Sequence, residues 1–284
     1  MASSYINIVT FLLTTLFYYL ALKPPLSYSQ LTNLDEYKKY TNNNFIYLGV
    51  YFLLILVIQF MVNAYIITTK CGGSITENIG AACAFTFFPW TLLFGVVIVI
   101  LIVYPGFKSA FSDVIGYFYV SKHANNILNE LLINKDIQGK IDADNISTKE
   151  QKIKMQDAAE AIIKICGNTS ILINQIVPNN FVEYWNILKP LMKPEYQNVS
   201  DSKTIEKMNE LFELVVTRDN VGEAMWFIYV GLLVTSIVQL NLSVRGCITN
   251  PKQMVKNYQE FLNKEEKVKK NKEISTSQVY TMSS

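Results

Sequence analysis

The sequence is poor in the residues that build most catalytic and metal sites. It contains one histidine, His123, so a Ser-His-Asp or Cys-His arrangement would depend on that residue alone. The four cysteines lie far apart, and none form a CxxC pair: Cys71, Cys83, Cys166 and Cys247. This spacing supports neither a metal site nor a disulfide framework. No GxxxxGKS, GxGxxG or HExxH motif is present, and we expect no enzymatic activity and no cofactor.

Charge is missing from four long stretches of the chain. Half of the residues are hydrophobic and 17% are charged, below the usual quarter. The runs near 5–22, 45–67, 83–104 and 224–244 hold no charged residue. Each has about the length needed to cross roughly 30 Å of hydrocarbon, and one Lys or Asp at the centre of a span costs about 2.5–3.5 kcal/mol. The pattern predicts an all-α integral membrane protein with four transmembrane helices. Four buried helices of a globular protein are the alternative.

The first apolar run has two interpretations. It lacks a basic start and a following A-x-A site, which disfavours a cleaved signal peptide. Pro24 and Pro25 follow it and end a helix there. We expect a retained span from Tyr5 to Leu22, with a cleaved signal peptide as the alternative.

Polar and small residues inside the spans predict contacts between helices. Gln59 and Asn63 are four residues apart and therefore share a helix face. An amide in hydrocarbon favours a partner on a neighbouring helix, and small residues let helices approach closely. We expect helix–helix packing at Gln59, Asn63, Gly231 and Thr235, although the two amides would also suit a transport site.

Aromatic residues near the ends of two runs predict membrane boundaries. Trp and Tyr are enriched at the interface between membrane and water. Trp90 lies near the start of the third run, and Trp226 and Tyr229 open the fourth. We expect these three side chains at the membrane interface.

The stretch VYPGFKSAFSDVIGYFYV, residues 103–120, leaves the third run abruptly. Pro105 stops the helix, Gly106 allows a turn, and Ser112 is placed to cap a new helix. Four apolar residues then share one helix face: Phe111, Val114, Ile115 and Phe118. We expect a helix along the membrane surface, with Lys108 reaching the headgroups. The interface would include Pro105, Gly106, Phe107, Lys108 and Phe111. The alternative is the first helix of a soluble domain.

The apolar runs divide the chain into four parts. Residues 1–104 would hold three spans, 105–222 a soluble α-helical domain, 223–245 the fourth span and 246–284 a basic, partly disordered tail. Within the domain, apolar stripes predict helices near 147–167, 179–192 and 201–220.

Four spans would place both termini on one side of the membrane. The lysine-rich tail favours the cytoplasm for that side. The N-x-S/T sites at Asn145, Asn168 and Asn198 would then lie on the other side. These motifs would be glycosylated there, or they occur by chance. In the tail, Met254, Tyr258, Phe261, Leu262 and Val268 approximate one helix face. This face would bind anionic lipid, or the helix would be fully solvated.

Two segments resemble membrane proteins of the nucleocytoplasmic large DNA viruses, the algal and giant-virus groups. They are PGFKSAFSDVIGY (105–117) and RDNVGEAMWFIYVGLLVTSIVQLNL (218–242). This chain has Phe107 where the family is expected to have tryptophan, and Ala110 where it is expected to have proline. The resemblance implies a membrane protein of the virion or the virus factory that contacts the capsid. It implies no reaction and no binding residues.

These observations predict a structural protein that organises a viral envelope or internal virion membrane. The expected partners are the bilayer, anionic lipid at the tail, other virion or membrane proteins, and further copies of this chain. Nucleic acid is not expected, because the net charge is only +2. A channel or transporter is one alternative. A tetraspanin-like organiser is another, although the loop between spans three and four holds only Cys166 where that family has paired cysteines.

Overall fold

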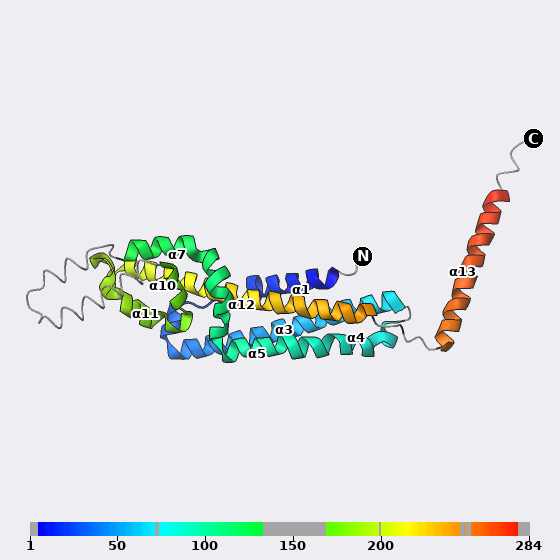
Figure 1. The fold of residues 1–284 in the computed structure, drawn as a ribbon, viewed down its shortest axis with the longest axis horizontal. Helices are drawn as coiled ribbons and strands as arrows, with labels where there is room; N and C mark the ends of the chain where they lie inside the picture. The colour runs from blue at the N-terminus through cyan, green and yellow to red at the C-terminus, as the bar shows by residue number, and fades with distance from the viewer. Residues whose placement is uncertain are drawn as a thin grey trace, which may run out of the picture.

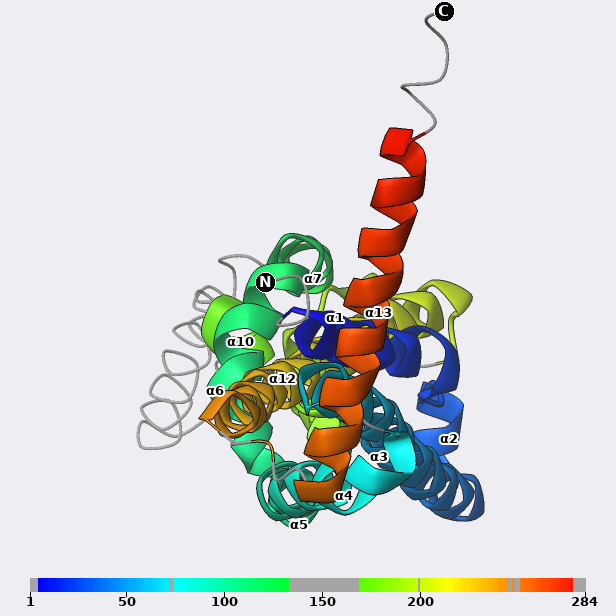
Figure 2. The same ribbon diagram turned by 90° about the vertical axis from the view of Figure 1, so that its right-hand side faces the viewer.

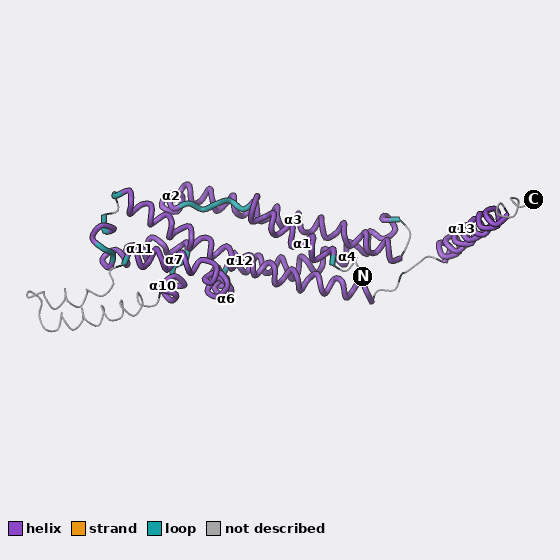
Figure 3. Tube along the Cα trace, turned by 90° about the horizontal axis from the view of Figure 1, so that it is seen from above, coloured by secondary structure: helices purple, strands orange, loops and turns teal. Residues whose placement is uncertain are grey.

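The computed structural model describes residues 5–71, 74–132, 169–198, 200–244, 247 and 251–277. Within these ranges the chain is helical, apart from turns and one isolated bridge between Leu132 and Met192. Figure 1 shows an elongated molecule, with a bundle of long helices that continues into a smaller helical domain at one end. The same arrangement is seen from above in Figure 3.

Three helices of the bundle are long and apolar enough to cross a membrane. They are α3 (Leu34–Cys71), the rod Ile75–Val103 and α12 (Ser202–Val244), with 38, 29 and 43 residues. The rod consists of α4 (Ile75–Pro89), the π-helical turns η3 (Trp90–Gly95) and α5 (Val96–Val103). The all-helical structure is thereby confirmed, and three of the four expected spans coincide with helices long and apolar enough to cross a membrane. The first run forms a shorter apolar helix, Ile6–Leu22, of 17 residues.

The helices extend well beyond the apolar runs. The rod begins at Ile75 rather than near residue 83, because Ser74 and Glu77 form a capping box ahead of it. The expected boundary between domain and fourth span, at residues 222 and 223, falls inside the single helix α12. At 1.5 Å per residue α12 is about 65 Å long, so it serves both the bundle and the helical domain.

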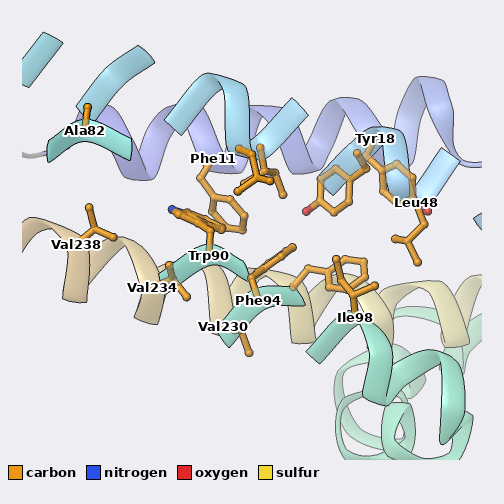
Figure 4. Packing of buried hydrophobic residues seen from close by; sticks show 14 of the residues in the cluster. Phe11, Tyr18, Leu48, Ala82, Trp90, Phe94, Ile98, Val230, Val234 and Val238 are labelled. Atoms are coloured by element: carbon orange, nitrogen blue, oxygen red, sulfur yellow. The ribbon is translucent and has the colours of Figure 1, made fainter. Parts of the chain in front are cut away.

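The first helix lies antiparallel to α3 and α12. It consists of α1 (Ile6–Phe17) and the π-helical turn η2 (Tyr18–Leu22). Its start is hydrogen-bonded to the later part of α3, from Asn7 to Asn63, and its end stacks on the earlier part, Tyr18 on Tyr51. The ring of Phe11 lies against Gly231 of α12. Aromatic side chains from all four helices fill the centre of this bundle (Figure 4).

Trp90 lies inside the bundle and not at its surface. Its side chain is 0% exposed, and its ring lies 5.4 Å from Phe11 and 5.3 Å from Phe94. The helix that carries it begins at Ile75, so Trp90 is far from the first turn. This corrects the expectation that Trp90 marks the membrane boundary.

The helical domain has a hydrophobic core of its own. It contains α7 (Tyr117–Leu131), α10 (Thr169–Gln175), η6 (Pro178–Asn180), α11 (Phe181–Leu188), η7 (Lys189–Leu191), η8 (Pro194–Tyr196) and the first part of α12. Phe181, Trp185 and Leu188 of α11 are buried in this core, and Tyr184 packs against it partly buried. The short helix α2 (Tyr28–Thr32) joins it, because Tyr28 packs on Phe181 and Phe212. The helix expected near 147–167 lies outside the described residues.

The segment after the third span forms consecutive short turns instead of one capped helix. They are η4 (Pro105–Lys108), α6 (Ser109–Phe111) and η5 (Ser112–Gly116), which runs directly into α7. Ser112 makes no side-chain cap and is buried. The expected cap at Ser112 is therefore wrong, because this side chain packs between helices.

The tail contains the helix α13 (Pro251–Ser277), which points away from the bundle (Figures 1 and 2). The described side chains of its apolar positions are exposed, including Tyr258, Phe261 and Leu262. The expected mobile end of the tail covers residues 275–284. α13 continues through residue 277, and residues 278–284 lie outside the described part of the chain.

A disulfide joins the ends of two spans. Cys71, the last residue of α3, is bonded to Cys247, with their Cα atoms 5.2 Å apart. Next to it, the Lys70 ammonium donates to the carbonyls of Leu242 and Ser243 at the end of α12, both at 2.8 Å. The expectation of no disulfide is therefore wrong. The two cysteines are 176 positions apart and meet only because α3 and α12 end side by side.

Candidate functional site

The two segments that carry the viral resemblance pack against each other where the bundle meets the helical domain. Glycines make this close approach possible. A Cβ on Gly222 would lie 2.6 Å from the Cβ of Ser112, and a Cβ on Gly116 would lie 2.5 Å from the carbonyl oxygen of Arg218. Real Cβ atoms essentially never come this close, so the turns at 112–116 require glycine on both sides of the contact.

Four charged side chains meet at this contact, and we call them the junction cluster: Lys23, Lys108, Asp219 and Glu223. Glu223 binds Lys23 through Oε1 and Lys108 through Oε2, the latter at 2.8 Å. Lys108 also reaches Asp219 Oδ2 at 3.0 Å. The Tyr19 hydroxyl donates to Glu223 at 3.0 Å. The cluster thereby ties the end of the first helix and the end of η4 to α12.

The cluster is shielded from water. The side chains of Lys23 and Glu223 are 7% and 9% exposed, and that of Lys108 is 16% exposed. Burial works to lower the pKa of Lys108, but the charges of Glu223 and Asp219 outweigh it and raise this pKa. For Lys23, burial dominates and lowers the pKa despite the nearby Glu223 carboxylate. Lys108 is thus held firmly as a cation, and Lys23 is the weaker of the two bases.

Arg218 adds a further buried cation beside the cluster. Its side chain is 0% exposed. Its Nη1 donates to the carbonyl of Ile173, and Asn174 Oδ1 lies 3.4 Å from the same nitrogen. These contacts link α12 to α10 of the helical domain. The Nε and Nη2 groups of Arg218 are buried and have no hydrogen-bond partner among the described residues.

The expected interface residues form an aromatic cluster on the outside of the junction. Phe107 and Phe111 lie 5.3 and 5.0 Å from the Trp226 ring, and Phe111 lies 6.1 Å from Tyr229. The Trp226 indole donates to the carbonyl of Phe107 at 2.9 Å. Pro105 and Gly106 are exposed beside it. The structure therefore brings six of the eight expected interface residues together, leaves Trp90 apart, and turns Lys108 into the junction cluster.

The neighbouring apolar face is largely exposed. Val114 and Phe118 are 67% and 84% exposed, whereas Phe111 and Ile115 are half-buried. Lys108 departs from its expected role, because it points into the junction cluster and not outward. Its ammonium finds Asp219 and Glu223 there, and two buried carboxylates offer a cation stronger partners than the surface does.

All four residues expected in helix packing lie between helices. Gln59 donates to the carbonyl of Asn7 at 3.1 Å, and Asn63 donates to the hydroxyl of Thr86 at 2.9 Å. Thr235 is buried in α12, one turn after Gly231, which meets the Phe11 ring. The amides thus connect α3 to both neighbouring helices.

A cavity of about 350 Å³ lies beside the junction cluster. Its walls come from α3, the end of α5, α12 and the first residues of the helical domain, and Lys23, Lys108, Asp219 and Glu223 all line it. Among the described residues, no group of three or more His, Cys, Asp or Glu side chains is placed to hold a metal ion. His123 is exposed on α7.

Sequence reasoning did not identify the junction cluster. Lys23 and Glu223 are 200 residues apart, and each lies just outside an apolar run. One signal was present, because Asp219 and Glu223 are four residues apart and so share the helix face that enters the fourth span.

Comparison with known proteins identifies no relative of this chain. No protein-family model matches the chain, and no match was found among curated proteins or solved structures.

Proposed function

We propose that this protein is a structural membrane protein with four spans, which organises a viral envelope or internal virion membrane. The proposed location in a membrane rests on one observation, the apolar outer surface of the bundle. Large apolar side chains on the three long helices face outward, including Met61, Leu92 and Leu240, which are 65%, 50% and 64% exposed. Soluble proteins rarely expose apolar surface of this extent, and lipid is the solvent that suits it.

The first helix has the same outer surface, which supports a fourth span. Leu13, Leu16 and Leu20 are 60%, 54% and 77% exposed along one side of it. Its 17 residues span about 25 Å, the short end of the transmembrane range. Its inner side is locked to α3 and α12 by Asn7, Phe11 and Tyr19.

An organising role follows from the way the helical domain is held. α12 runs without a break from the domain into the bundle, and the junction cluster and Arg218 fix the remaining contacts. A domain held rigidly at a membrane is suited to bind other virion proteins, capsid proteins among them. The viral resemblance of the two junction segments supports this setting. The channel alternative has less support, because Gln59 and Asn63 bond to other helices.

The orientation in the membrane is the one point where two signals disagree. Lysines in the tail favour cytoplasmic termini, but only positive residues within about 15–20 residues of a span count strongly. The disulfide between Cys71 and Cys247 lies at the same end of the bundle as the start of α1, because Asn7 is hydrogen-bonded to Asn63 in the later part of α3. Disulfides persist in oxidising compartments and are rare in the cytosol. We give the disulfide more weight and place both termini on the oxidising side, with the helical domain in the cytosol.

Fractionation of infected or expressing cells tests this function. The chain is expected to copurify with virus particles and to stay in the membrane pellet after alkaline carbonate treatment. Release of the chain by carbonate, or its absence from purified particles, would contradict the proposal.

A further inference from the structure

The cavity beside the junction cluster opens toward the outside of the bundle. Two of its lining residues, Phe45 of α3 and Ile102 of α5, are 44% and 37% exposed. Deeper in the bundle α3 meets η3 of the same rod, where the Phe52 ring lies 3.5 Å from the position of a Cβ on Gly95. The opening therefore lies between α3 and α5, on a surface that would face lipid.

The cavity changes from apolar to charged along its length. On α12 the lining runs from Phe227 to the charged Glu223 and Asp219, one turn at a time, and ends at Val216. On α3 it runs in the same direction, from Leu48 to Asn44. An amphipathic molecule matches this gradient, with a hydrocarbon chain at the bundle end and a polar group at the domain end.

The polar end carries both signs of charge. Lys23 and Lys108 line it together with Asp113, Asp219 and Glu223. An ammonium group has three donors, and Lys108 uses two of them on Asp219 and Glu223, which leaves one for a ligand. Asn44 also lines the cavity, and within the described part of the chain its buried amide oxygen has no hydrogen-bond partner. The wall thus offers donors to a phosphate and acceptors to an amine.

We propose that this cavity binds one phosphatidylethanolamine molecule from the bilayer. Its phosphate would lie against Lys23 and Lys108, and its primary ammonium against Asp219 and the Asn44 oxygen. One acyl chain would leave through the opening between Phe45 and Ile102. A phosphatidylcholine headgroup lacks the N–H donors, and a phosphatidylglycerol headgroup lacks the cation. The inference depends on the proposed location in a membrane.

The test is lipid retention by the full chain. Protein extracted in detergent is exposed to equal amounts of phosphatidylethanolamine, phosphatidylcholine and phosphatidylglycerol, and bound lipid is measured by native mass spectrometry. Phosphatidylethanolamine is expected to be retained at least about tenfold over the other two, since one hydrogen bond to a charged group changes affinity by roughly that factor. Soluble glycerophosphoethanolamine is expected not to displace it, because it lacks the chain.

A matched pair of variants locates the bound lipid. Thr41→Trp adds bulk to a residue that lines the cavity, and it is expected to abolish retention. Ile46→Trp adds the same bulk on the same helix at a position 62% exposed, outside the cavity lining, and it should retain lipid as the parent does. Should Thr41→Trp fail to fold, Asn44→Leu replaces it, with an expected loss of about tenfold.

Equal retention by the parent and a folded cavity variant would overturn the inference, as would equal retention of the three lipids. Displacement of the bound lipid by glycerophosphoethanolamine would also overturn the inference, because it would show that the site recognises a free headgroup and not a lipid. Carbonate resistance is measured on the same membranes. A chain that resists carbonate but shows no lipid preference refutes the cavity ligand alone, whereas a chain that carbonate releases refutes the proposed function.

Discussion

At the scale of single residues, Glu223 is the acceptor that holds three parts of the chain together. It contacts Lys23 after the first helix, Lys108 after the rod, and Tyr19. Removing one partner of a buried ion pair leaves the other charge uncompensated, which costs about 3–5 kcal/mol. Glu223→Gln should therefore lower the free energy of unfolding by about that amount, measured by thermal or denaturant unfolding in detergent.

The control for Glu223→Gln is a double-mutant cycle with Lys23→Gln. The double variant is expected to lose clearly less stability than the sum of the single variants, since both changes remove the same contact. Strictly additive losses would show that the pair contributes nothing by itself.

Gly222 is the residue where the two resembling segments come closest. Because an added Cβ would lie 2.6 Å from Ser112, Gly222→Ala should destabilise the fold by about 1–3 kcal/mol through overpacking. Gly49→Ala is the matched control in another long helix, because nothing lies within 4 Å of its added Cβ. The control should be neutral or slightly stabilising, by up to about 1 kcal/mol. Equal melting temperatures for the two variants would contradict the tight contact.

At the scale of elements, the disulfide ties the end of α3 to the residues after α12. After alkylation of the denatured, unreduced protein, peptides that contain Cys71 and Cys247 should remain linked until reductant is added. Cys83, which is free, serves as the internal control and should be alkylated without reductant. Full alkylation of Cys71 and Cys247 before reduction would show that the bond is absent. The argument for termini on the oxidising side would then fail.

The tail helix α13 presents exposed apolar side chains among lysines. Each lysine near an anionic surface contributes about 1 kcal/mol to binding, and Phe261 and Leu262 are 62% and 43% exposed. In vesicles that contain phosphatidylserine, trypsin should cleave the tail more slowly than in phosphatidylcholine vesicles. Phe261→Glu should remove this protection, whereas Asn263→Glu, with the same added charge on the opposite helix face, should remove less of it. Identical cleavage in both kinds of vesicle would indicate a solvated helix.

The elements also show what the sequence could and could not predict. The three long apolar helices were predictable, because about twenty residues without charge are a strong signal. Their ends were not, since α12 continues through Glu223 and Arg218 only because these charges find partners in other segments. Trp90 was misplaced because the rule for interfacial tryptophan ignores packing, and the bundle offered its ring Phe11 and Phe94.

At the scale of the whole molecule, two hydrophobic cores are joined by one helix. The bundle core and the domain core contain no residue in common, and α12 contributes Phe227 to the first and Phe212 to the second. Between them lie the junction cluster and its cavity. The bundle core is wrapped in exposed apolar side chains, so the whole account depends on what surrounds that part of the molecule.

Spin labels on the outer face of each helix test this most directly. Leu20, Met61, Leu92 and Leu240 are replaced by cysteine one at a time and labelled in the reconstituted protein, with Cys83 and Cys166 changed to serine. Collision with dissolved oxygen should exceed collision with a water-soluble nickel chelate at all four positions, because oxygen concentrates in hydrocarbon. A label at exposed Lys203 should show the reverse. Preferential access of the nickel chelate at the four apolar positions would contradict the account.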